Sequence, residues 1–147
     1  MGNKRQTLKS YIYPIITLLI SIISIIWMGK ASLSTGLFAG LGEAVITLFI
    51  LIPLMAITGS IYMGYKSFPK IQIAVYSLLI AITYAAARFV EYNIEKIVAT
   101  GEYELWVVHP IQIIIIAAII YLISYLGKLV KYTVIRVKTK SNKEGKQ

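Results

Sequence analysis

Five ionisable residues at the ends of long apolar segments are the candidates for chemistry in this chain. Arg88, Glu91 and Glu95 are spaced by three and four residues, so a helix would place them on neighbouring turns, while Glu43 and His109 lie near the start of two further apolar segments. Such a group can form an ion pair that fixes helix register, a pocket for an anion or lipid headgroup, or a proton relay; alternatively, Arg88 only snorkels to the surface. We expect a buried charge cluster of Glu43, Arg88, Glu91 and His109, in which Arg88 pairs with Glu43 or Glu91.

The residue types that most enzyme chemistry needs are missing. The chain has no cysteine, no aspartate and a single histidine, so one protomer cannot build a conventional transition-metal site or a bis-histidine haem site. It has no HExxH helix, no nucleophile elbow and no phosphate-binding glycine loop. Glu91 and Glu95 could form an acid–base pair, but a place at a helix end facing water favours solvated charge. We expect no enzymatic activity, no metal and no cofactor.

Four apolar segments, at about 11–28, 37–62, 71–90 and 107–126, must position these residues. Each supplies the roughly 20 apolar residues with which a helix crosses about 30 Å of hydrocarbon. Hydrophobic residues make up 58% and charged residues 14% of the 147 residues, against about 45–50% and 25% in soluble domains. The sequence predicts an all-α, integral membrane four-helix bundle at 11–127, between a basic N-terminal segment at 1–10 and a basic juxtamembrane tail at 128–147.

The positions of lysine and arginine predict the orientation. Basic residues dominate the N-terminal segment, the second connection and the tail, whereas the third connection holds one lysine against four glutamates. Basic residues concentrate on the cytoplasmic side of membrane proteins, and tryptophan is enriched at the interfaces. We therefore expect a protein of the cell membrane with both termini in the cytoplasm, and with Trp27 and Trp106 at the outer interface.

The first apolar segment has an alternative interpretation as a secretory signal. A basic start, an apolar run and the stretch Gly29-Lys30-Ala31 are features of a cleavable leader. The run of about 18 residues is longer than the roughly 7–15 of such leaders, so we expect it to be retained. Cleavage would leave three spans with the same orientation.

Small residues recur at helical spacing within the segments. Such faces let helix backbones approach closely, which matters where lipid removes the hydrophobic drive for association. They either hold the bundle together or seat another protomer or a partner subunit. Pro53, inside the second segment, predicts a kink that frees a carbonyl near Phe49. The small faces are Thr17, Ser21 and Ser24; Gly36, Gly40 and Ala44; Ala56, Ser60 and Gly64; and Ala74, Ser77, Ala81 and Ala85.

The tail is strongly basic and contains one acidic residue, Glu144. A basic segment beside a membrane attracts anionic lipid at about 1 kcal/mol per residue. Nucleic acid is the rival polyanion, but the segment starts at the membrane and the topology already accounts for its charge. We expect anionic lipid and no nucleic acid as the partner, and disorder from about Thr139. The candidate headgroup contacts are Lys128, Lys131, Arg136 and Lys138.

The second and third segments resemble a known family. Glu43, the Phe68-Pro69 turn and the stretch Ala85-Ala86-Ala87-Arg88-Phe89-Val90-Glu91 are similar to the phosphate-starvation-inducible E family, over about residues 43–131. The resemblance implies a small four-helix membrane protein with an arginine late in its third helix and a basic C-terminus. It implies no particular activity. The chain departs from the family at 48–54, which is apolar here and acidic at one position there.

Two functions from different classes remain open. The first is a non-enzymatic subunit or scaffold of a membrane complex or homo-oligomer, assembled through the small-residue faces. The second is a small oligomeric carrier or channel for an ion or small solute, using Glu43 and Arg88. A path across the membrane needs polar residues at several depths, yet the fourth segment has almost none between Gln112 and Tyr121. We therefore expect the subunit.

Overall fold

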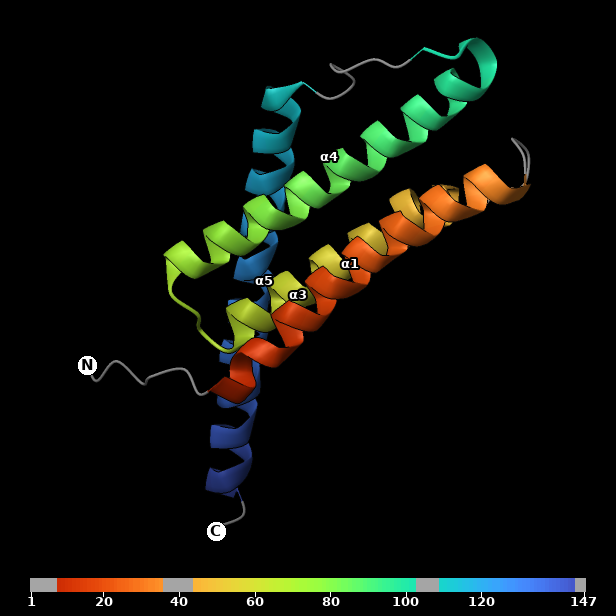
Figure 1. Cartoon of the computed structure of the whole chain (residues 1–147). Coiled ribbons are helices and arrows are strands. Elements are labelled where there is room, and N and C mark those ends of the chain that lie inside the picture. Colours follow the sequence, from red (N-terminus) through yellow and green to blue (C-terminus); the bar gives the residue numbers. More distant parts are fainter. Residues whose placement is uncertain (1–7, 36–43, 103–108, 145–147) are drawn as a thin grey trace.

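The part of the chain that the structure describes contains helices and no strands. The computed structural model describes residues 8–35, 44–102 and 109–144. Within these residues, four helical stretches are long and apolar enough to cross a membrane: Lys9–Lys30, Ile46–Tyr65, Lys70–Asn93 and Pro110–Thr139. The predicted all-α class with four long apolar helices is confirmed. The elements are α1 (Leu8–Thr35), the π-helical segment η1 (Ile46–Leu51), α3 (Ile52–Tyr65), α4 (Lys70–Thr100) and α5 (Pro110–Glu144) (Figure 1).

Helices α1, α4 and α5 are longer than the apolar segments that predict them. Helix α4 ends at Gly101, whose φ of 75° and N–H bond to the Ile97 carbonyl (2.9 Å) form a left-handed cap. Helix α5 starts with Pro110, a residue suited to the first helical position, and continues to Glu144. The prediction of disorder from about Thr139 is therefore wrong for residues 139–144, which are helical. Because the apolar part of α5 already supplies the costly helix nucleus, each further residue needs only elongation.

The helix changes from α-helical to π-helical hydrogen bonding directly before Pro53. The Ile52 N–H donates to the Thr47 carbonyl, five residues back instead of four. Pro53 has no N–H for the Phe49 carbonyl, and in a regular helix its ring would clash with that carbonyl. The expected kink site is thus a π-helical segment, η1, that runs directly into α3.

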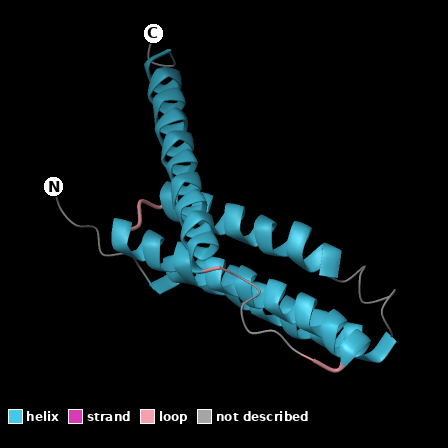
Figure 2. Cartoon of the chain, turned by 90° about the horizontal axis from the view of Figure 1, so that it is seen from above, coloured by secondary structure: helices cyan, strands magenta, loops and turns pink. Residues whose placement is uncertain are grey.

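Helices α1, α3 and α4 run side by side, and α5 crosses them obliquely (Figures 1 and 2). We name the end of the molecule that holds the connection between α3 and α4 the turn end. The Tyr11 and Phe68 rings meet there with centroids 5.1 Å apart, and Lys131 of α5 donates to Ser67. The start of α1 and the latter half of α5 therefore share the turn end.

The small-residue faces predicted from the sequence are mostly buried. In α1 and α3 every described member is buried, while in α4 Ala74 is exposed and the other three are buried. In the face formed by Gly36, Gly40 and Ala44, the two glycines lie outside the described residues. Packing between helices is thus built on residues with little side chain. The buried members are Thr17, Ser21, Ser24, Ala44, Ala56, Ser60, Gly64, Ser77, Ala81 and Ala85.

Helices α3 and α5 approach each other closely at two glycines. A β-carbon on Gly64 would lie 1.8 Å from the Ser124 carbonyl oxygen, and one on Gly127 would lie 2.0 Å from the Ile61 carbonyl oxygen. Each glycine therefore faces the backbone of the other helix, as in the close crossings that small residues allow in membranes. This contact fixes where α5 crosses the other helices.

Candidate functional site

Two of the described charged residues of α4 form a local ion pair. Arg88 donates to the Glu91 carboxylate one helical turn later, with side-chain exposures of 41% and 17%. The expected pairing of Arg88 with Glu91 is confirmed, whereas Glu43 and the side chain of Glu95 lie outside the described residues. Because both partners belong to α4, this ion pair joins neighbouring turns of a single helix.

His109 is a helix cap in this structure. Its carbonyl accepts the Gln112 N–H at 2.9 Å, and its Nδ1 accepts the Ile111 N–H at 3.4 Å. The imidazole is exposed, so the expectation that His109 is buried with Arg88 and Glu91 is wrong. A residue directly before the first helical proline is placed to satisfy the free N–H groups of the helix start, and His109 does so.

Metal ligands do not gather in the described part of the chain. No three His, Asp or Glu side chains lie close enough there to hold a metal ion. The carboxylates that are described belong to Glu91 and Glu102, at different positions along α4 and its end.

The most elaborate polar contact is a node between three helices that the sequence does not single out. The Tyr76 hydroxyl of α4 lies 2.9 Å from the Thr17 hydroxyl of α1 and 3.2 Å from the Met55 carbonyl of α3. It fits because Gly59 has no side chain: a β-carbon there would lie 1.9 Å from the Tyr76 oxygen. Tyr76 and Thr17 are both buried. We call Tyr76, Thr17, Met55 and Gly59 the Tyr76 node.

The Tyr76 node has fewer hydroxyl protons than oxygen–oxygen contacts. Thr17 also approaches the Pro14 carbonyl at 2.8 Å, so two hydroxyl protons serve three oxygen–oxygen contacts. If Thr17 donates to Pro14, Tyr76 donates either to Thr17 or to Met55. Each arrangement links two helices, and together they tie α4 to both α1 and α3.

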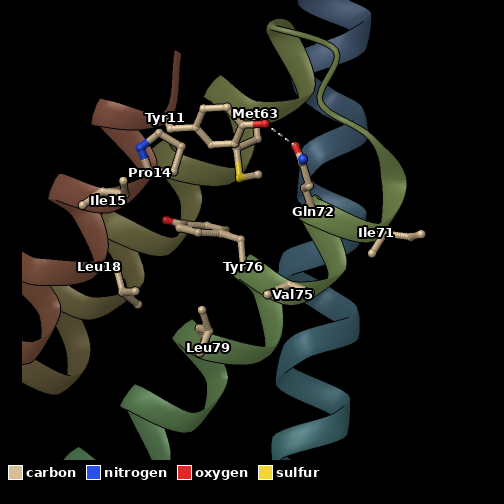
Figure 3. Close-up of a pocket in the computed structure, with 10 residues that line it drawn as sticks. All are labelled: Tyr11, Pro14, Ile15, Leu18, Met63, Ile71, Gln72, Val75, Tyr76 and Leu79. Atoms are coloured by element: carbon tan, nitrogen blue, oxygen red, sulfur yellow. Dashed lines mark hydrogen bonds between the residues drawn. The ribbon is translucent and has the colours of Figure 1, made fainter. Parts of the chain in front are cut away.

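A groove of about 240 Å³ opens beside the node, between α1 and α4 (Figure 3). At one end of the groove the Tyr11 hydroxyl donates to the Gln72 side-chain oxygen at 3.2 Å. The remaining walls are almost entirely apolar, so the groove suits a hydrocarbon chain better than a charged solute. It is lined by Tyr11, Pro14, Ile15, Leu18, Met63, Ile71, Gln72, Val75, Tyr76 and Leu79.

Two further grooves follow the sides of α5. One of about 270 Å³ lies against α3, where Ile52 and Pro53 face Ile119 and Ile123. The other, of about 540 Å³, lies against α4 and is lined largely by small and aliphatic residues, including Ala74 and Ala117.

Most buried hydroxyls are satisfied inside their own helix. Ser21, Ser77 and Thr83 each donate to the carbonyl four residues back, at 2.8–2.9 Å. The Thr47 and Ser60 hydroxyls are the buried exceptions in the described residues, with no hydrogen-bond partner. The hydroxyls therefore serve mainly as small packing groups and do not line a continuous polar path.

The described basic side chains of the tail fall into two groups. Lys131 donates to the Ser67 hydroxyl at 2.6 Å, and the Lys128 ammonium lies 4.6 Å from the centre of the Tyr125 ring. Arg136 and Lys138 are exposed on α5, and no described acidic residue pairs with them. Lys131 is thus held against the α3–α4 turn and Lys128 against its own helix, whereas Arg136 and Lys138 are exposed.

Comparison of the chain with known protein families, with curated proteins and with solved structures found no match. The likeness to the phosphate-starvation-inducible E family stays a prediction.

Proposed function

We propose that the chain is a multi-pass protein of the cell membrane that acts as a non-enzymatic subunit or scaffold of a membrane complex or homo-oligomer. Four apolar helices of sufficient length support insertion into a bilayer. The start of α1, the α3–α4 turn and the latter half of α5 share one end and carry most of the basic residues. By the positive-inside rule this turn end, with both termini, faces the cytoplasm.

One observation carries the choice of a subunit over a carrier. In the described part of the chain the buried hydroxyls are mostly bonded to their own helices, and the grooves described above have almost purely apolar walls. An ion or a polar solute would find no series of ligands in the described helices to replace its water. Small buried faces and uncovered apolar grooves instead suit the packing of helices.

The basic tail adds a second partner class to this proposal. Lys128, Lys131, Arg136 and Lys138 contact anionic lipid headgroups at the cytoplasmic surface, each contributing about 1 kcal/mol where it lies near the membrane. Their positions support this role, because Lys131 lies at the turn end beside Ser67, and Arg136 and Lys138 are exposed further along the same helix.

A flux assay tests the subunit against the carrier. Purified protein in liposomes is expected to pass sodium, potassium, protons, chloride and phosphate no faster than protein-free liposomes, with a known ionophore as the positive control. The unpartnered hydroxyls of Thr47 and Ser60 are the feature that favours a carrier. Robust flux that disappears in the Glu43→Gln variant would overturn the proposed function in favour of the carrier.

A further inference from the structure

The turn between α3 and α4 has a serine where helix ends usually place a glycine. The Phe68 N–H donates to the Met63 carbonyl at 3.1 Å, and the Ser67 N–H donates to the Gly64 carbonyl at 3.0 Å. These two bonds form a Schellman motif, in which the first residue after the helix cap is left-handed. That residue is Ser67, with a φ of 57°. Serine adopts this conformation less readily than glycine, but it adds a hydroxyl group to the turn.

The Ser67 hydroxyl holds a lysine of α5 against the turn, which lies beside α5 in Figure 1. The Lys131 ammonium donates to this hydroxyl at 2.6 Å, and Lys131 is partly buried. A hydroxyl is neutral, so the bond does not balance the positive charge. Residues 1–42, 44–90 and 105–143 contain no aspartate or glutamate, and no described carboxylate forms an ion pair with Lys131. The described part of the chain therefore supplies no negative charge for this lysine.

Lys66 adds a second positive charge to the turn. It directly precedes Ser67 and is exposed, and its ammonium lies 5.8 Å from the centre of the Tyr62 ring, within reach of a cation–π contact. Lys70 follows as the first residue of α4. We call Lys66, Ser67 and Lys131 the Ser67 cluster. It combines two ammonium groups and one hydroxyl from the α3–α4 turn and α5.

The Ser67 cluster lies at the depth of lipid headgroups if the spans fill the hydrocarbon. The apolar stretch Ile46–Tyr65 ends directly before Lys66, and the next stretch, Lys70–Asn93, begins three residues after Ser67. A short turn between two spans lies where the hydrocarbon gives way to headgroups. Tyrosine is enriched at this level, and Tyr62 lies beside Lys66. Of the anions that two ammonium groups can bind, lipid phosphate is the one concentrated at this depth.

We propose that the Ser67 cluster binds the phosphate of one anionic phospholipid, and that this lipid ties α5 to the α3–α4 turn. Phosphate oxygens accept charge-assisted hydrogen bonds from the ammonium groups of Lys66 and Lys131, while Ser67 keeps Lys131 in place. The inference rests on the proposed membrane insertion and deepens the lipid contact proposed for the tail. It adds the turn as a second side of the site, and it makes the binding saturable.

Two other basic residues of α5 provide the comparison. Arg136 and Lys138 carry the same charge as Lys131, but they are exposed and form no hydrogen bond or ion pair with another described residue. Such residues attract a charged bilayer through its surface potential, which a neutral detergent micelle does not have. Single lipids added to the protein in neutral detergent therefore distinguish a site from diffuse attraction.

Native mass spectrometry in neutral detergent counts the lipids bound to each chain, with phosphatidylglycerol as the anionic lipid and phosphatidylcholine as the neutral one. The wild type is expected to bind its first phosphatidylglycerol at least about tenfold more tightly than phosphatidylcholine. Lys66→Gln and Lys131→Gln each remove one charge and keep a hydrogen-bond donor. They are expected to weaken this binding about fivefold, the equivalent of about 1 kcal/mol. Arg136→Gln and Lys138→Gln lose the same charge and are expected to change it less than about twofold.

A Ser67→Gly variant separates a lipid site from a contact that only holds the fold. Glycine suits the left-handed conformation, so the melting temperature in neutral detergent, followed by circular dichroism, is expected to stay the same or rise. The first phosphatidylglycerol is nevertheless expected to bind about fivefold more weakly, because Lys131 loses its partner in the turn. A lower melting temperature with unchanged lipid binding would overturn the site.

The possible failures are distinguishable. Equal weakening by all four charge-removing variants, or weakening by none of them, would overturn the Ser67 cluster as a site and leave the diffuse attraction of the tail in place. Equal binding of the two lipids by the wild type would overturn both the site and the lipid contact proposed for the tail. Full displacement of phosphatidylglycerol by an equal concentration of inorganic phosphate would overturn lipid as the ligand. The subunit role is tested separately by the flux assay and survives each of these results.

Discussion

Replacing Gly64 with alanine is expected to push α3 away from α5 and to lower the free energy of unfolding by about 3 kcal/mol, near the upper end for overpacked sites. The new β-carbon would lie 1.8 Å from the Ser124 carbonyl oxygen. Backbone cannot rotate aside as a side chain can, so the two helices must separate. Gly127→Ala is expected to act in the same direction, since its β-carbon would lie 2.0 Å from the Ile61 carbonyl oxygen.

The measurement is reversible unfolding in bicelles, followed by circular dichroism as sodium dodecyl sulfate is added. Gly29→Ala is the matched control, because its β-carbon would lie 3.7 Å from the nearest Val90 carbon, an ordinary contact. That control is expected to leave stability unchanged or to raise it by up to about 1 kcal/mol through helix propensity. Equal stability of Gly64→Ala, Gly127→Ala and Gly29→Ala would contradict the close crossing of α3 and α5.

Replacing Gly59 with alanine is expected to break the Tyr76 node, at a cost of about 2–3 kcal/mol. The β-carbon would lie 1.9 Å from the Tyr76 oxygen, 2.7 Å from Cζ of its ring and 3.0 Å from the Thr17 hydroxyl. Tyr76→Phe alone removes hydrogen bonds and is expected to cost about 1 kcal/mol. The double variant removes the shortest clash, so we expect it to be more stable than the sum of the two single effects by about 1 kcal/mol or more.

A double-mutant cycle in the same unfolding assay measures this coupling. Tyr84→Phe combined with Gly59→Ala is the control pair, because Tyr84 lines a different groove, against α5, and its change should add independently. Additive effects of Gly59→Ala and Tyr76→Phe would show that the Tyr76 hydroxyl does not occupy the space beside Gly59.

Most of the fold could be predicted from the length of the apolar segments and from the spacing of the small residues. The four spans follow from runs of apolar residues that few other structures can accommodate, and Thr17, Ser60 and Ser77 are buried as their spacing predicts. Helix ends were harder to predict, because hydrophobicity marks the apolar part and not the helix. Helix α4 ends at the Gly101 cap and α5 continues through its basic residues, both of which depend on local backbone bonds.

The candidate site was less predictable than the fold. The Arg88–Glu91 pair lies within one helix, so sequence spacing alone could indicate it. The position of His109 depends on how α5 starts. Its side chain accepts the Ile111 N–H at the helix start, and its expected depth in the membrane did not predict this contact. The Tyr76 node joins residues 59 positions apart in the sequence, and only the pairing of helices brings them together. A glycine at 59 beside the small face of Ala56, Ser60 and Gly64 was the one available signal.

The central claim is that these helices cross the cell membrane with the turn end in the cytoplasm, and the labelling of single cysteines tests it most directly. Lys66→Cys, Glu102→Cys and Thr139→Cys are treated on intact cells with a membrane-impermeant maleimide, then again after permeabilisation. The account predicts that Glu102→Cys reacts in intact cells, and that Lys66→Cys and Thr139→Cys react only after permeabilisation. Labelling of Lys66→Cys and Glu102→Cys from the same side would contradict it, because α4 would then not span the bilayer.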